Sequence, residues 1–306
     1  MKAGVPDTYK LAEGFREDIK SDAEVSRVVT RNFETLQAWK LEEDTSDTRV
    51  DVELLLEALD KMESRESELL LRFYKDPEYL LTGYPEKGEI VAKLRSYIKR
   101  RAVVDRNAIS YLDPLLAVLN LYAPLDIFSV NYDILIEQFS SLHQKQLSDG
   151  FDVDWNRDSF RRSRDIRLYK LHGSVTWYKT KHADYVKVPV LAKQDEIELI
   201  TGETASSLIL YPMHKWDYDE PLLDLLMMLK NRLQTAKYCI VVGYSFRDEH
   251  ITRVFWDAAR NNRDLHLILI SGRGLSCSVR LTGFRGPSWT LNSSWQRGHV
   301  TATISD

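Results

Sequence analysis

The chain has 306 residues, which is enough for one large domain or two small ones with a hydrophobic core. Apolar residues make up 43% and charged residues 29%, a globular mixture that excludes a wholly disordered or fibrous chain. The 42 basic and 46 acidic residues give a net charge of −4, so no global positive field favours nucleic acid or an anionic membrane as a partner.

The cysteine content and the apolar runs indicate the compartment. Cys239 and Cys277 form neither a CxxC pair nor a disulfide framework, which excludes a four-cysteine zinc ribbon and fits a reducing environment. The apolar run from Tyr238 to Val242 is far shorter than the roughly 18 residues of a membrane span. The first residues also lack the apolar core of a signal peptide. We therefore expect a cytoplasmic protein.

Helical patterns dominate the amino-terminal part of the chain. Apolar side chains recur at spacings of four and three at Leu55, Leu59 and Met62, which is typical of one face of a helix. Charge-rich stretches such as residues 40–51 predict solvated surface. We expect these helices to form an insertion over residues 22–120.

Short apolar runs and helical segments alternate after residue 125. The runs predict strands at 127–130, 166–171, 208–210, 238–242 and 265–270, and helices at 134–143, 221–236 and 249–259. This alternation predicts an α/β fold, a Rossmann-like and mostly parallel sheet with helices on both faces. We expect one domain over residues 1–272. Residues 273–306 are expected to be an irregular or disordered tail, because the last 36 residues hold 5 of the 13 glycines.

Polar residues follow three of the predicted strands, where ligands bind in an open parallel sheet. They are Asn131-Tyr132-Asp133, His172-Gly173 and Gly243-Tyr244-Ser245. Each motif also has a purely structural interpretation, since Asp133 and Asp248 suit helix N-caps and a histidine at a strand end is commonly a structural hydrogen-bonding residue. Taken singly, the structural interpretation is favoured for each motif.

Together, in this order and spacing, the three motifs resemble the sirtuin-like NAD-processing family. The similarity is greatest to the prokaryotic sirtuin-like NAD hydrolases of antiphage defence. It covers residues 1–10 and 120–272, and it is carried by the segments 131–137, 171–177 and 243–251. The resemblance implies hydrolysis of NAD, as substrate, to nicotinamide and ADP-ribose, without zinc or another metal.

The resemblance also implies roles for individual residues. Asn131 would hold the nicotinamide ribose or an attacking water, Asp133 would recognise the nicotinamide end, and His172 would be the general base. An oriented amide and imidazole suit this reaction, because breaking the N-glycosidic bond builds positive charge on the ribose. The residues implied in binding the dinucleotide are Gly4, Pro6, Gly173, Gly243 and Ser245.

The opening of the chain departs from the family pattern. A Gly-Ala-Gly-x-Ser loop, whose backbone amides would bind the pyrophosphate, is absent before Gly4, so we expect a version shortened at the amino terminus. The alternative function is therefore a non-catalytic module that binds NAD or ADP-ribose, forms a homo-oligomer or serves a partner protein of a defence system. A third hypothesis, nucleic-acid contact through the basic stretches 93–106 and 161–164, is less favoured because such clusters are usually solvated surface.

Overall fold

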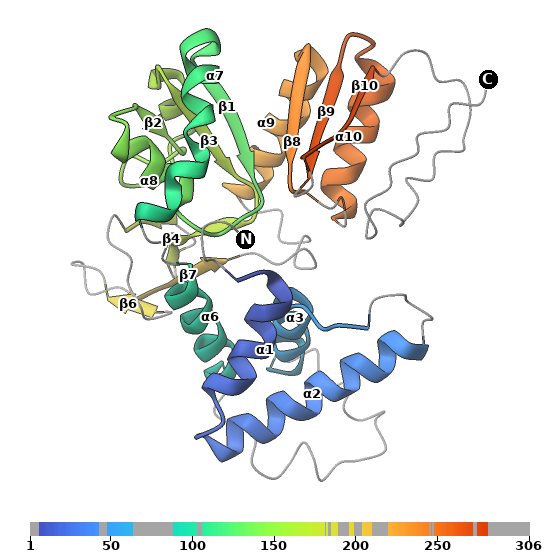
Figure 1. The fold of residues 1–306 in the computed structure, drawn as a ribbon. Coiled ribbons are helices and arrows are strands. Elements are labelled where there is room, and N and C mark those ends of the chain that lie inside the picture. Colours follow the sequence, from blue (N-terminus) through green and yellow to red (C-terminus); the bar gives the residue numbers. More distant parts are fainter. Residues whose placement is uncertain are drawn as a thin grey trace. The chain divides into compact units, whose positions relative to one another are not determined.

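The structure is a computed structural model that describes residues 6–42, 48–63, 88–102, 106–180, 182, 185–188, 196–198, 204–209, 220–244, 246, 248–271 and 274–280 (Figure 1). The chain divides into two compact units, Met1–Leu222 and Leu223–Asp306, where the sequence suggested one domain up to residue 272. Among the described residues, no helix has the length and apolar character needed to cross a membrane.

The first unit opens with a helical block, drawn in blue to teal in Figure 1. Asp7 begins the first helix by accepting a 2.8 Å hydrogen bond from the Lys10 amide, as expected of an N-cap. Leu55 and Leu59, which the apolar spacing assigned to a helix, are fully buried in the block's core. The helices of the block are α1 (Thr8–Asp18), α2 (Ala23–Glu42), α3 (Val52–Glu63) and α6 (Glu89–Arg101).

A three-stranded parallel sheet follows in the same unit. Its strands are β1 (Leu125–Ser129), β2 (Leu147–Ser148) and β3 (Ile166–Lys170), in the order β1-β3-β2. Helix α7 (Pro114–Tyr122) precedes β1 and helix α8 (Leu135–Leu142) follows it. The predictions of strands at 127–130 and 166–171 and of the helix at 134–143 are confirmed within a few residues at each end.

A four-stranded antiparallel sheet completes the first unit and was not foreseen. It comprises β4 (Gly173–Thr180), β5 (Tyr185–Lys187), β6 (Glu196–Glu198) and β7 (Thr204–Ile209), in the order β5-β4-β7-β6. The strand predicted at 208–210 is the end of β7, which pairs antiparallel with β4. Only a two-residue turn separates β3 from β4. This turn is too short for β4 to pair in parallel with β3, because a parallel connection needs a crossover of about a dozen residues or more. Strand β4 instead pairs with β5 and β7 in the second sheet.

The second unit alternates helices and strands as predicted. It contains α9 (Leu222–Thr235), β8 (Tyr238–Val242), α10 (Glu249–Asn261) and β9 (His266–Ser271), and β8 pairs in parallel with β9. The mixed α/β fold with parallel strand pairs and helices therefore agrees with the fold class predicted from the sequence.

One strand of the second unit corrects the sequence analysis. Gly274–Arg280 were expected to be irregular, but they form β10, which pairs antiparallel with β9. Glycine and serine in this segment obscured its apolar alternation at Leu275, Cys277 and Val279, the period of two that marks a strand. Residues 281–306 of the expected tail lie outside the described residues.

Candidate functional site

The turns that follow β1 and β3 lie side by side. The two strands pair in parallel and end level, with Ser129 opposite Lys170. Beyond the strands, the Leu171 amide donates to the Ser129 carbonyl at 2.9 Å and the Val175 amide donates to the Tyr132 carbonyl at 3.0 Å. These two bonds lie on either side of His172 in the chain, so three predicted site residues, Asn131, Asp133 and His172, come from adjoining turns.

The Asn131–Asp133 turn presents one exposed and one buried side chain. The side chain of Asn131 is exposed, and its backbone amide donates to the Ser129 hydroxyl at 3.2 Å. Asp133 is buried, and its Oδ1 accepts a 3.1 Å hydrogen bond from the Leu135 amide at the start of α8. The N-cap position itself is Ile134, one residue later than the sequence suggested. The carboxylate of Asp133 thus supports the first turn of α8, and the exposed side-chain amide of Asn131 is available to a ligand.

His172 occupies the turn between β3 and β4. Its side chain is buried, and its ring centroid lies 6.4 Å from that of Tyr132 in the neighbouring turn. Gly173 has a φ of +80°, a left-handed conformation that glycine adopts without strain. The turn from β3 into β4 therefore depends on this glycine. The turn brings the imidazole of His172 next to the Asn131–Asp133 turn.

The helical block packs directly against these turns. Tyr132 and Val175 belong to the same buried cluster as the core residues of α1, α2, α3 and α6. The Tyr132 hydroxyl donates to Glu53 Oε1 of α3 at 2.8 Å, and Lys99 Nζ of α6 donates to the Tyr178 hydroxyl of β4 at 2.8 Å. The block is therefore a structural support of the turns and shares one core with them.

A buried charge pair lies behind the Asn131–Asp133 turn. Lys170 of β3 is 1% exposed, and its Nζ donates to the carbonyl oxygens of Asn131 and Asp133. The same ammonium lies 3.5 Å from Oε1 of Glu137 on α8. Burial raises the pKa of the Glu137 carboxyl, and the charge of Lys170 acts in the opposite direction.

No role was predicted for this pair from the sequence, although a signal for it exists. Ile166, Leu168 and Lys170 alternate along β3 and therefore share one face of the strand, and Ile166 and Leu168 are fully buried. A lysine at a core-facing position needs partners for its charge, because an unpaired buried ammonium is very costly.

Tyr111 adds a phenol close to the same turn. It lies in the short 3-10 helix Arg106–Leu112 and is 39% exposed. Burial raises the pKa of the Tyr111 hydroxyl, and the negative charge of Asp133 raises it further. Tyr111 is therefore within electrostatic reach of Asp133. No motif in the sequence pointed to it.

The turn after β8 is built locally within the second unit. Gly243 has a φ of +64°, and its amide donates to the Ile270 carbonyl at 2.9 Å. Asp248 is the N-cap of α10, and its Oδ1 accepts from the amides of His250 at 2.9 Å and Ile251 at 3.1 Å. The structural interpretation of Asp248 as a helix cap is thus confirmed.

Comparison with known proteins identifies the family. The sequence profile of the SIR2-like domain matches residues 126–281, half of the chain, from β1 to just past β10. The chain belongs to the SIR2-like domain family. No curated protein matches it.

Two solved structures are similar to this SIR2-like chain at low identity. One is described as the crystal structure of a SIR2 homolog–NAD complex, with 15% identity and a TM-score of 0.39, and the alignment covers 69% of this chain and 65% of that one. The other is described as the structural basis for sirtuin substrate affinity, with 11% identity, a TM-score of 0.26 and coverages of 52% and 86%. The SIR2-like chain thus spans less than two thirds of the first structure's length.

Not all predicted site residues of the SIR2-like domain can be placed. Gly4 and Ser245 lie outside the described residues. Pro6 lies directly before Asp7, the N-cap of α1, and is half-buried. Gly243 belongs to the second unit, which is described separately from the unit that holds His172.

Several cations of the basic stretches in the SIR2-like chain pair with acidic neighbours. Lys93 Nζ lies 2.6 Å from both Asp22 Oδ2 and Glu89 Oε1. Arg100 pairs with Asp18 at 2.6 Å, and Arg162 pairs with Asp152, whose pKa this contact lowers. These ion pairs favour solvated surface over a nucleic-acid interface.

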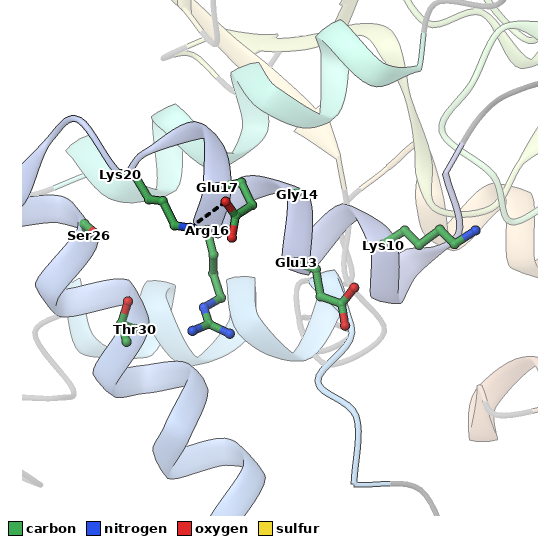
Figure 2. A pocket seen from close by; sticks show the side chains of 8 residues that line it. All are labelled: Lys10, Glu13, Gly14, Arg16, Glu17, Lys20, Ser26 and Thr30. Carbon is green, nitrogen blue, oxygen red and sulfur yellow. Dashed lines mark ion pairs between the residues drawn. The ribbon is translucent and has the colours of Figure 1, made fainter.

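The two cavities characterised in the SIR2-like chain both lie in the helical block. The first, of about 580 Å³, is lined by residues of α1 and α2 (Figure 2). There Glu17 pairs with Lys20 at 2.6 Å, and the Arg16 guanidinium lies 4.3 Å from the Phe33 ring centroid. The second, of about 550 Å³, lies between α1 and α6. Neither includes a predicted site residue. Within the described residues, no cluster of His, Cys, Asp or Glu could hold a metal ion.

Proposed function

We propose that this SIR2-like domain is an NAD glycohydrolase that releases nicotinamide and ADP-ribose, and that it depletes cytoplasmic NAD in infected cells as part of antiphage defence. One observation carries the proposal. The Leu171–Ser129 and Val175–Tyr132 backbone bonds hold the His172 turn against the turn that contains Asn131 and Asp133. This arrangement supports an imidazole and an amide acting on one substrate.

The proposed reaction is a hydrolysis at C1′ of the nicotinamide ribose. The bond between C1′ and the nicotinamide nitrogen breaks, and nicotinamide leaves with the electron pair. A water molecule attacks C1′, His172 accepts the proton that the water loses, and the oxygen becomes the new hydroxyl of ADP-ribose. The largely buried position of His172 limits competition from bulk water during this transfer.

The neighbouring side chains have complementary roles in the proposal. The exposed Asn131 side-chain amide orients the ribose or the attacking water, and Asp133 recognises the nicotinamide end. Gly173 permits close approach of the substrate to the backbone. Roles of Gly4, Pro6, Gly243 and Ser245 in binding the dinucleotide stay predictions from the family resemblance.

The test is nicotinamide release from NAD by the purified chain and by two variants. His172→Ala is expected to lower the rate by at least about 100-fold, because general-base catalysis typically contributes about 10²–10⁴-fold. Asn131→Ala is expected to lower it by a similar factor, because removing one oriented hydrogen-bonding group typically costs about 10²–10³-fold. Circular dichroism would verify that both variants fold.

Matched controls come from the same unit. His143 pairs with Asp113 at 3.2 Å, and Asn156 caps a short helix at residues 157–162. His143→Ala and Asn156→Ala should therefore retain the activity of the unmutated protein. Unchanged rates in His172→Ala or Asn131→Ala would overturn the assigned roles.

Calorimetry separates the enzyme from the non-catalytic module. Titration of the chain with NAD and with ADP-ribose measures binding directly. Binding of either compound without nicotinamide release would replace the proposed hydrolase with a binding module, whereas turnover would exclude that alternative.

A further inference from the structure

The ammonium of Lys170 joins three groups in the interior of the first unit. It donates to the Asn131 carbonyl at 3.3 Å and to the Asp133 carbonyl, and it lies 3.5 Å from the Glu137 carboxylate. The lysine is 1% exposed and the glutamate side chain 16% exposed. Two backbone carbonyls and a carboxylate therefore offset the cost of burying this positive charge.

Glu137 depends strongly on this lysine. Within the described part of the chain, neither of its carboxylate oxygens accepts a hydrogen bond. The other charges that act on it are those of Asp149 and Lys187, which pair with each other at 2.6 Å. Removing Lys170 alone would consequently leave a buried carboxylate without its nearest positive charge.

The geometry restrains the turn that carries two proposed site residues. The carbonyls that Lys170 binds lie on either side of Tyr132, so one ammonium limits the rotation of both flanking peptide units. The Tyr132 carbonyl between them accepts from the Val175 amide. The backbone from Asn131 to Asp133 is thus held at three successive carbonyls by residues at least 37 positions away in sequence.

We infer that Lys170, paired with Glu137, is a positioning residue that keeps the Asn131–Asp133 turn in the conformation the reaction needs. Lys170 contacts the backbone carbonyls of this turn and leaves the exposed Asn131 side chain to the substrate. The kinetic part of this inference rests on the proposed NAD hydrolysis. The structural part does not, because the order of the turn can be measured without a substrate.

The experiment compares Lys170→Met with Lys99→Met. Lys99 is equally buried, but its ammonium binds the Tyr178 hydroxyl, so its replacement removes a buried lysine elsewhere in the unit. Hydrogen exchange of the amides of residues 130–136 reports on the turn, and kcat and KM report on catalysis. Lys170→Met should speed exchange of this segment at least about 10-fold relative to Lys99→Met and lower kcat more than it raises KM.

A double variant distinguishes positioning from general stability. In Lys170→Met/Glu137→Leu both charges are gone, so much of the stability lost in Lys170→Met should return. The turn remains without its ammonium, so its exchange should stay fast and kcat should stay low. If the double variant instead recovers the exchange and kcat of the unmutated protein, the inference is wrong.

The failure of the inference differs from failure of the proposed function. If the unmutated protein releases no nicotinamide, NAD hydrolysis is refuted, and hydrogen exchange alone still decides the role of Lys170. If the protein is active but Lys170→Met exchanges like Lys99→Met, the hydrolase stands and the positioning role is refuted.

Discussion

Two parallel strand pairs of the chain, β1–β3 and β8–β9, lead into polar turns. The turns after the first pair and the turn after β8 are stabilised in different ways. At the ends of β1 and β3, backbone bonds and Lys170 connect residues that are distant in sequence. At the end of β8, the Gly243 amide makes one such bond, while Asp248 binds amides two and three residues away. The first turn is a product of tertiary structure, and the second is mainly local.

Burial follows the same division. Ile166 and Leu168 of β3 are fully buried, whereas Tyr238, Ile240 and Val242 of β8 are 51–70% exposed. Oriented groups in a low-dielectric environment interact strongly with a ligand. The comparison therefore favours the first unit as the one that can hold the proposed site residues rigidly.

The largest expected effect is that of Trp177→Ala in β4. Trp177 is fully buried, with its ring 4.7 Å from that of Phe151. Its truncation should cost about 3–5 kcal/mol of unfolding free energy, the usual range for a buried tryptophan. Urea denaturation followed by circular dichroism measures this. Tyr238→Ala in the exposed β8 is the control, and equal losses in both variants would remove the distinction between the two regions.

The second prediction concerns the local turn of the second unit. Asp248→Ala removes both capping bonds of α10 and should cost about 1 kcal/mol. Asp248→Asn retains an acceptor oxygen and should lose much less. Thermal unfolding of the three proteins tests this, and hydrogen exchange at residues 130–136 should be unchanged. An equal loss for alanine and asparagine would argue against capping as the role of Asp248.

A similar or smaller loss is expected for Tyr132→Phe, which removes the hydrogen bond to Glu53 but keeps the ring in the core. Such bonds contribute about 1 kcal/mol to stability. Tyr122→Phe, at a 66% exposed position, should be neutral. The measurement is the midpoint of urea unfolding. A neutral Tyr132→Phe would show that the helical block supports the turn through apolar packing alone.

The smallest effect is kinetic and concerns Cys239 in β8. Its neighbours Tyr238 and Ile240 are exposed, but burial raises the pKa of the Cys239 thiol to about 11 from a usual 9.0. A shift of this size lowers the thiolate fraction at pH 8 about 100-fold, because each unit is tenfold. Alkylation by iodoacetamide, followed by mass spectrometry, should be correspondingly slow and accelerate up to about pH 11. Labelling at the rate of glutathione would contradict the burial of this face.

Much of the fold was predictable from local pattern. Apolar runs identified β1, β3, β8 and β9, and the stretches between them identified α8, α9 and α10. Backbone hydrogen bonding and side-chain periodicity act over a few residues, so a sequence window contains the information needed. The same reasoning missed β4 as a separate antiparallel strand and β10 as any strand, because pairing partners are chosen by tertiary contacts.

For the site, the sequence by itself determined the residue types and their order: Asn131 and Asp133 after one strand, His172 and Gly173 after another. The tertiary structure decided that these two turns adjoin, that Tyr132 joins the core of the helical block, and that Lys170 and Glu137 lie behind the turn. The reason is physical. A strand's side-chain pattern depends on neighbours two to four residues away, whereas the pairing of a buried ammonium depends on groups brought together only when the core closes.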